Sequence, residues 1–261
     1  MTEQTENNGN RAPVAIVTGA AKRIGRVLSL ELARHGWDIG VHYHQSLDEA
    51  ESLAGEVRKT GRQAILLQAD LSSTSDVQEI VPQCISSLGT PALLINNASL
   101  FENDRIEDLT DESWDAHINT NLKAPVLLSQ AFANALPQDI SGNIINIIDQ
   151  KVQNLTPYFF SYTISKAGLW TATQTMAQAL APHIRVNAVS PGPVLQSIHQ
   201  TEEQFARQYR STPLQRGTTP EEIASAVQFI LNAPAMTGQM IILDGGQHLS
   251  WKGFKARRNE D

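Results

Sequence analysis

A short apolar run, a glycine-containing loop and a helical pattern follow one another near the start of the chain. Residues 14–17 are Val-Ala-Ile-Val, residues 18–25 are Thr-Gly-Ala-Ala-Lys-Arg-Ile-Gly, and apolar residues then recur at helical spacing as far as His35. Glycine lets a backbone approach a phosphate closely, and the free N–H groups and the dipole at a helix start attract an anion. This strand, loop and helix therefore predict a fold that binds the pyrophosphate of a dinucleotide.

The rest of the chain alternates between short apolar strands and helices. Such alternation requires a parallel sheet with helices on both faces, so we predict a doubly wound, Rossmann-type α/β fold. The 261 residues fit a single domain, expected at residues 13–250 between a disordered tail at 1–12 and a second tail at 251–261. Further strands are predicted at residues 38–43, 64–68, 93–95, 144–148, 184–189 and 240–243, and helices at residues 49–59, 75–88, 113–135, 160–180 and 221–231. Residues 191–213 are predicted to be irregular, and a connection of that length is a candidate lid.

Charge and cysteine content narrow the class of partner. The formal net charge of −7 and the pI near 5.5 argue against nucleic acid or an anionic membrane, because both require a basic face. Cys84 is the only cysteine, which rules out an internal disulfide, and no cluster of Cys and His residues predicts a metal site. Residues 1–11 are polar, and no stretch has the roughly 18 consecutive apolar residues of a membrane span. We expect a cytoplasmic protein whose partner is a small molecule.

Polar residues and glycines directly follow five of the predicted strands. They are Gly19, Asp70, Asn97, Asp149 and the turn at residues 190–192. Parallel sheets bind ligands at the carboxyl ends of their strands, so we expect these residues to line one edge of the sheet.

Asp149, Tyr162 and Lys166 bring an acid, a phenol and an ammonium group within reach of one another. Tyr162 and Lys166 stand four residues apart in a predicted helix and share one face, and Asp149 ends the preceding strand. A neighbouring lysine favours the phenolate and is expected to bring the tyrosine pKa from about 10 toward neutral pH. Tyr162 is therefore a candidate proton donor, although such a pair also occurs on the surface of ordinary helices.

Five motifs occur in an order and at intervals that resemble the short-chain dehydrogenase/reductase family, over about residues 14–249. They are Thr18-Gly-x3-Arg-x-Gly25, Asn96-Asn-Ala98, Asn121, Tyr162-x3-Lys166 and Pro191-Gly192. The resemblance implies a homotetramer that transfers hydride to or from a nicotinamide cofactor. It further implies that Tyr162 donates a proton, that Lys166 holds the nicotinamide ribose and tunes the tyrosine, and that Asn121 places a water of the proton relay. Taken alone, Asn121 is better explained as a polar residue that bends a helix.

Two positions depart from the commonest pattern of the family. Arg23 stands where the middle glycine of the loop usually lies, and Asp149 stands where a serine usually bonds the substrate carbonyl oxygen. A carboxylate at that place would repel a developing alkoxide, whereas an acid suits a substrate whose nitrogen must be protonated. The alternative is that Asp149 caps a turn at the end of the strand.

Other short runs resemble the pteridine reductase branch of the family, which includes bacterial dihydromonapterin reductases. These runs are Thr18-Gly-Ala-Ala-Lys-Arg23, His42-Tyr43-His44, Asn97-Ala98-Ser99-Leu100-Phe101 and Asp244-Gly245-Gly246. The resemblance implies that Phe101 stacks on a pterin opposite the nicotinamide, and that Ser99 and Arg23 bind the pterin and the cofactor phosphates. Asp149 and Tyr162 would protonate or orient the ring. The alternative is that Phe101 is a loop aromatic that fills the core.

The end of the second strand indicates which dinucleotide is bound. An acidic residue there would bind the ribose of NAD, but the sequence has none, so we predict NADPH with its 2′-phosphate held by Lys22, His44 and Ser46. The full set of predicted cofactor-binding residues is Thr18, Gly19, Lys22, Arg23, Ile24, Gly25, His42, His44, Ser46, Asp70, Leu71, Asn97, Ala98, Ser99, Tyr162, Lys166, Pro191, Gly192 and Val194.

Three functions remain open at this point. The first is NADPH-dependent reduction of a dihydropterin. The second is reduction of a carbonyl substrate, such as a 3-oxoacyl thioester or a ketone, against which Asp149 argues. The third is a non-catalytic NADP-binding sensor, against which the intact Tyr162, Lys166 and Asn121 argue.

Overall fold

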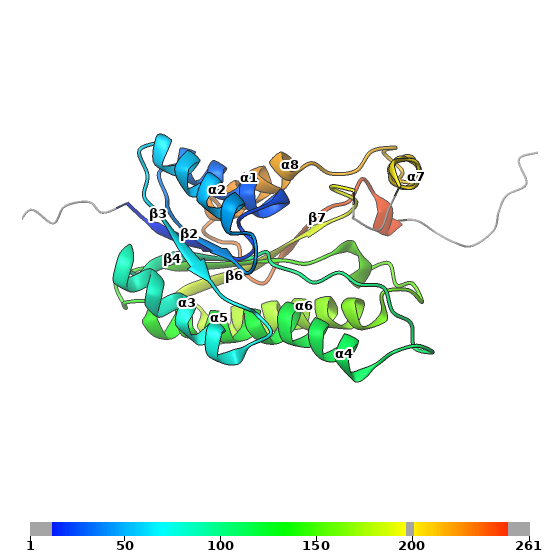
Figure 1. Ribbon diagram of the computed structural model, residues 1–261, viewed down its shortest axis with the longest axis horizontal. Coiled ribbons are helices and arrows are strands. Elements are labelled where there is room, and N and C mark those ends of the chain that lie inside the picture. The colour runs from blue at the N-terminus through cyan, green and yellow to red at the C-terminus, as the bar shows by residue number, and fades with distance from the viewer. Residues whose placement is uncertain (1–11, 197–200, 250–261) are drawn as a thin grey trace, which may run out of the picture.

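Apolar residues with many β-branched side chains form seven parallel strands, and these strands build one sheet (Figure 1). The computed structural model describes residues 12–196 and 201–249. The strands are β1 (Val14–Val17), β2 (Asp38–Tyr43), β3 (Ala64–Gln68), β4 (Pro91–Asn96), β5 (Gly142–Ile147), β6 (Ile184–Pro191) and β7 (Met240–Leu243). All seven lie where the sequence predicts them, with ends that differ by no more than two residues.

The order of the strands places a crevice at the carboxyl end of β1. The sheet has the order β3-β2-β1-β4-β5-β6-β7, and β1 pairs in parallel with β2 on one side and with β4 on the other. The chain therefore winds outward in both directions from β1. In open parallel sheets, ligands bind at such a point of reversal.

Helices cover both faces of the sheet, which confirms the predicted doubly wound α/β fold (Figure 1). One face carries α1, α2 and α8, and the other carries α3, α4, α5 and α6, each layer packing on its own apolar core. The helices are α1 (Arg23–Arg34), α2 (Leu47–Lys59), α3 (Thr74–Ser87), α4 (Asp111–Ile118), α5 (Ala124–Ala135), α6 (Phe160–Leu180), α7 (Glu202–Arg210) and α8 (Pro220–Leu231), with short turns at η2 (Gln150–Val152) and η3 (Gln247–Leu249). Among these described residues, no helix is both long enough and apolar enough to cross a membrane.

The helix predicted over residues 113–135 is interrupted. It begins at Asp111 and contains a π-helical turn, η1 (Asn119–Lys123), before it continues as α5. Pro125 has no N–H to donate to the carbonyl of Asn121 four residues earlier, and its ring would crowd that carbonyl in a regular α-helix. The wider turn accommodates the proline, and π turns of this kind are frequent at functional sites.

The stretch predicted to be irregular over residues 191–213 contains helix α7, so that prediction is wrong for part of it. Thr201 and Gln204 form a capping box at the start of α7, a pattern visible in the sequence. No residue of α7 is buried. The helix therefore lacks the buried apolar stripe on which the prediction of a helix from the sequence relies. Residues 197–200, most of the predicted tail at 1–12 and the tail at 251–261 lie outside the described residues.

Candidate active site

The glycine loop packs directly against the end of β4. The Asn97 amide donates to the carbonyl oxygens of Thr18 at 2.8 Å and Gly19 at 3.2 Å, and the Thr18 hydroxyl accepts from the backbone N–H groups of Asn97 and Ala98. A Cβ atom at Gly25 would lie 2.2 Å from the Gly19 carbonyl oxygen, so only glycine fits there. The first turn of α1 has neither a side-chain cap nor an acidic residue, so its free N–H groups can bind an anion.

His42 supports the glycine loop from below. Its Nδ1 accepts a hydrogen bond from the Gly19 N–H at 3.0 Å, and its Nε2 lies 3.3 Å from the Ala69 carbonyl oxygen. Burial lowers the pKa of His42 to about 4, so the ring is neutral. Both ring nitrogens bond the protein backbone, and His42 therefore contributes to a cofactor site by fixing the loop, without a nitrogen left for a phosphate.

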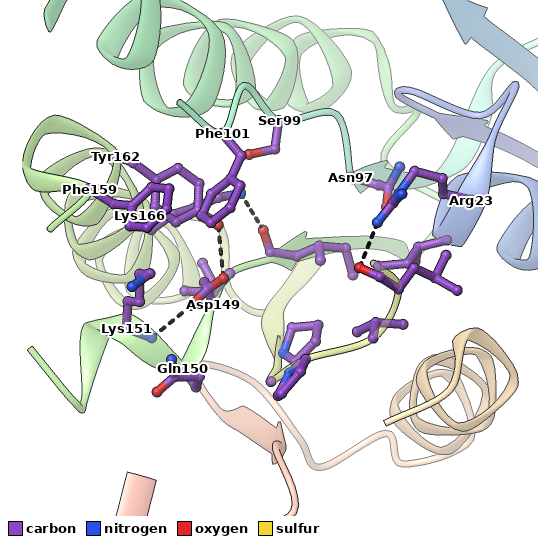
Figure 2. Close-up of a pocket in the computed structure, with 18 of the residues that line it drawn as sticks. Arg23, Asn97, Ser99, Phe101, Asp149, Gln150, Lys151, Phe159, Tyr162 and Lys166 are labelled. Atoms are coloured by element: carbon purple, nitrogen blue, oxygen red, sulfur yellow. Dashed lines mark hydrogen bonds between the residues drawn. The ribbon is translucent and has the colours of Figure 1, made fainter. Parts of the chain in front are cut away.

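Arg23 joins the glycine loop to the segment that follows β6. Its backbone is left-handed, with φ of 53°, which explains why a glycine commonly stands at this position. Its guanidinium donates to the carbonyl oxygens of Gln196 at 2.9 Å and Leu195 at 3.0 Å (Figure 2). The side chain thus spans one end of the cavity.

Asp149, Tyr162 and Lys166 meet at the carboxyl end of β5 (Figure 2). The Tyr162 hydroxyl donates to Asp149 at 3.0 Å, the Asp149 carboxylate accepts the Lys151 N–H at 2.8 Å, and Lys166 Nζ donates to the Ile147 carbonyl oxygen at 2.9 Å. Tyr162 and Lys166 are 4% and 2% exposed, so these polar groups interact with little screening by water.

The electrostatics of the site differ from the prediction for Tyr162. Burial first, and then the charge and hydrogen bond of Asp149, raise the pKa of Tyr162 well above its ordinary value, so the phenolate is not favoured. Burial also raises the pKa of Asp149 and lowers the pKa of Lys166 to about 8. The pKa of Tyr162 is not lowered by Lys166, because Lys166 bonds a backbone carbonyl whereas Asp149 bonds the phenol directly. The site holds a neutral phenol that can donate a proton.

Asn121 lies in the π turn η1 and is fully buried. Its side-chain oxygen accepts the Leu100 N–H at 2.8 Å, and its amide donates to the Leu100 carbonyl at 2.9 Å and to the Ser165 hydroxyl at 3.1 Å. The side chain therefore holds the loop that carries Ser99 and Phe101. Its backbone carbonyl receives no hydrogen bond from Pro125, which has no N–H.

Phe101 belongs to an aromatic cluster beside Tyr162. Its ring stacks on Phe159 with centroids 4.3 Å apart and an angle of 9°, and it meets the edge of Tyr162 at 4.7 Å. The Lys151 ammonium lies 4.6 Å from the Phe159 centroid on that ring's face. Figure 2 shows Phe159 on the side of Phe101 that faces away from Arg23. Phe159 thus backs one face of Phe101.

One cavity of about 940 Å³ brings most of the predicted residues together. The predicted residues in its wall are Gly19, Lys22, Arg23, Ile24, Gly25, Asn97, Ala98, Ser99, Phe101, Asp149, Tyr162, Lys166, Pro191, Gly192 and Val194. Outside the wall lie Thr18, His42, His44, Ser46, Asp70, Leu71 and Asn121. Of the residues predicted to hold a 2′-phosphate, Lys22 forms an ion pair with Glu49 at 2.7 Å, and His44 faces Asp70 at 3.8 Å.

Several residues of the wall have no counterpart in the sequence prediction. Gln150 and Lys151 directly follow Asp149, and Phe159 directly precedes α6. Phe205 lies in α7. The aromatic run Tyr158-Phe159-Phe160 before a helix is the one signal that could have drawn attention to Phe159. The position of Phe205 depends on a helix that apolar spacing does not reveal.

Comparison with known proteins places this fold and site in a family. The family model described as Enoyl-(Acyl carrier protein) reductase matches residues 19–248. The 3-oxoacyl-[acyl-carrier-protein] reductase FabG of Staphylococcus epidermidis is 31% identical over 240 residues, which are 90% of this chain and 98% of that protein. The chain belongs to the short-chain dehydrogenase/reductase family, as its motifs indicated.

Two solved structures are similar over nearly the whole chain. FolM alternative dihydrofolate reductase 1 from Brucella suis, in complex with NADP, is 47% identical with a TM-score of 0.89, and the match covers 92% of this chain and 96% of that one. The protein of the same name from Brucella canis, complexed with NADP, is 46% identical with a TM-score of 0.90, covering 94% and 97%.

Proposed function

We propose that this protein is an NADPH-dependent reductase of dihydropterins, which are reduced at a ring C=N bond to tetrahydropterins. The observation that carries the proposal is the hydrogen bond from Tyr162 to Asp149, which stands where the family usually has a serine. Tyr162 is held as a neutral phenol that can give a proton to a ring nitrogen, and the Asp149 carboxylate beside it can accept an N–H of the ring. In its ionised form Asp149 opposes a developing negative oxygen.

NADP is the cofactor that the site and its relatives support. Gly25 lets the glycine loop pack closely against Gly19 and Asn97, and the uncapped first turn of α1 offers N–H donors for a pyrophosphate. Lys22 and Arg23 add positive charge at the wall of the cavity. The similar FolM structures are NADP complexes. When bound, the reduced nicotinamide supplies the hydride for the reaction.

The residues of the chain supply the proton and hold the substrate. Tyr162 gives its proton to the ring nitrogen, and the neighbouring Asp149 either orients that nitrogen or restores the proton of the phenol. The Lys166 ammonium, fixed on the Ile147 carbonyl, binds the ribose hydroxyls beside the tyrosine. Phe101 presents a flat face to the pterin, where stacking contributes about 0.5 to 1.5 kcal/mol beyond the burial of area.

Reduction of a 3-oxoacyl thioester is the second candidate, because FabG proteins are among the similar sequences. A negative oxygen would then form next to Asp149, which opposes it unless the carboxyl is protonated. The Phe101–Phe159 stack also narrows that side of the cavity with two rigid rings, which suits a flat heterocycle better than an acyl chain.

Oxidation of NADPH, followed by absorbance, tests the proposal. The purified protein is mixed with 7,8-dihydrobiopterin, dihydromonapterin, dihydrofolate or an acetoacetyl thioester, and NADH serves as the cofactor control. We expect turnover with the dihydropterins and a preference for NADPH. Turnover of the thioester alone would assign the protein to the carbonyl reductases, and NADPH binding without any turnover would indicate a sensor.

Asp149→Ser gives the test at the level of the residue. This variant restores the predicted serine of the family and should lower kcat on the dihydropterin by roughly 100-fold, the usual contribution of a positioned acid. Asp139→Ser, on an exposed loop, is the matched control. A variant that reduces dihydropterins as fast as the wild type would remove Asp149 from the mechanism.

A further inference from the structure

A buried polar cluster lies next to the proposed site but touches no part of the cavity. Its members are Asp104, His117 and Ser161, which are 6%, 0% and 0% exposed. They come from the loop after β4, from α4 and from the first turn of α6. The three residue types are those of a hydrolytic triad, but here the serine bonds the carboxylate itself and is closed to solvent, so it cannot act as a nucleophile.

The hydrogen bonds of His117 define one tautomer. The backbone N–H of Glu102 can only donate, and it donates to His117 Nε2 at 3.2 Å. Nδ1 must therefore carry the proton, and it lies 2.7 Å from the Ser161 hydroxyl and 3.0 Å from the Ser113 carbonyl oxygen. The Ser161 hydroxyl in turn donates to Asp104. His117 thus links the loop after β4 to α4 and α6.

Asp104 fixes the far end of the same loop to helix α6. Its carboxylate accepts the Ser161 N–H at 3.1 Å and the Ser113 hydroxyl at 3.2 Å, and its carbonyl accepts the Phe160 N–H at 3.2 Å. Burial acts to raise the pKa of Asp104, but the hydrogen bonds from Ser161 and Ser113 outweigh it, and the pKa is lowered. Phe159, the residue before α6, provides no side-chain cap, so Asp104 caps the helix that carries Tyr162.

These bonds leave Phe101 between two fixed points. We call residues 99–104 the Phe101 loop; its Leu100 is held by Asn121, and its Glu102 is held by His117. We propose that His117 is a positioning residue, which keeps Phe101 in its substrate-binding place by accepting the Glu102 N–H. This role rests on the proposed reductase function, because Phe101 is the residue that would stack on the pterin.

The hydrogen bond between the Glu102 N–H and His117 depends on pH, because only a neutral His117 ring can accept it. Burial lowers the pKa of His117, while the charges of Asp104 and Glu102 act in the opposite direction, and the edge of Tyr162 lies 6.0 Å from the ring. The folded protein therefore takes up this proton less readily than the unfolded chain, and the ring is neutral at pH 7. As the pH falls through the lowered pKa, Nε2 gains a hydrogen that faces the Glu102 N–H, and the bond is lost.

Two variants and a matched control test this role. His117→Leu removes the acceptor, His117→Gln replaces it with an uncharged one, and His35→Gln changes an exposed histidine directly after α1. At pH 8 we expect His117→Leu to raise the KM for dihydrobiopterin about tenfold, which corresponds to one hydrogen bond to a buried group, with an unchanged Kd for NADPH. His117→Gln should stay within about twofold of the wild type. It should also lack the rise in KM that we expect of the wild type below the ordinary histidine pKa of about 6.5.

Amide exchange separates this inference from the proposed function. In the wild type the Glu102 amide should be protected, in His117→Leu it should exchange faster, and in His117→Gln and His35→Gln it should remain slow. The measurement requires no substrate. A Glu102 amide that stays protected in His117→Leu, or an unchanged KM in that variant, would overturn the positioning role. Absence of dihydropterin turnover in the wild type would overturn the reductase proposal. The exchange result would then still test whether His117 holds the Glu102 N–H.

Discussion

The two ends of the cavity are fixed by different kinds of contact. At the glycine loop, Thr18, Asn97 and Gly25 meet through backbone atoms or through a side chain on a backbone carbonyl. At the substrate end, the side chains of Asn121 and His117 hold the loop that carries Phe101, and Asp149 bonds Tyr162. Both ends join residues that are far apart in the chain, but the first depends mostly on backbone groups and on the absence of a side chain at Gly25, whereas the second depends on the identity of several side chains. Variants at the two ends should therefore fail in different ways.

Tyr162→Phe should give the largest loss of activity, and it should affect the substrate end of the cavity without affecting the cofactor end. Loss of the phenolic proton is expected to lower kcat by about 10³-fold, within the range for general acids, while the Kd for NADPH stays nearly constant. Stopped-flow reduction kinetics and NADPH fluorescence titration measure the two quantities. Tyr158→Phe, on an exposed tyrosine, is the control. Persistent activity in Tyr162→Phe would show that another group donates the proton.

Gly25→Ala should affect the cofactor end instead. The added Cβ would lie 2.2 Å from the Gly19 carbonyl oxygen and 2.7 Å from the Asn97 amide, so the loop must shift. Overpacking of this kind costs about 1 to 3 kcal/mol, and we expect NADPH affinity to fall by about the corresponding 10- to 100-fold. Gly55→Ala, where nothing lies within 4 Å, should leave binding unchanged. Equal NADPH affinity in Gly25→Ala and Gly55→Ala would show that the close packing at Gly25 does not shape the cofactor site.

The buried Lys166 at the substrate end should make the free energy of unfolding depend on pH. Its pKa falls from 10.5 to about 8, so between these values the unfolded chain binds more protons, and stability rises with pH. Relative to Lys166→Met, the wild type should gain up to about 3 kcal/mol in free energy of unfolding from pH 8 to pH 10.5. Denaturant unfolding at several pH values measures this, with Lys59→Met as the exposed control. Parallel pH curves for the wild type and Lys166→Met would mean that Lys166 is not perturbed.

Arg23→Ala should have the smallest effect, because its two hydrogen bonds join exposed groups. The contacts to Leu195 and Gln196 are expected to contribute about 1 kcal/mol together, so the KM for NADPH or for the dihydropterin should rise by only about fivefold. Faster amide exchange at residues 195 and 196 should accompany that change. Arg34→Ala, on the exposed side of α1, serves for comparison; a loss of activity beyond 100-fold in Arg23→Ala would assign Arg23 a direct part in the chemistry.

The sequence by itself determined the strands, their order of alternation and the glycine loop. Strand and helix spacing are local properties, because a period of 2 or 3.6 residues states which faces are buried. The motif at residues 18–25 likewise places its glycines by local geometry. The same reasoning placed Asp149, Tyr162 and Lys166 at one edge of the sheet, where the structure has them.

Only the tertiary structure decided how these groups are poised. The raised pKa of Tyr162 results from burial and from Asp149 at 3.0 Å, neither of which a spacing of thirteen residues specifies. Asp104 caps α6 from 57 residues away, and Phe159 lies against Phe101 because that helix begins where it does. Desolvation and contacts between distant segments exist only after the chain has packed. For that reason the sequence determines which residues form the site, and the packed structure determines their protonation and orientation.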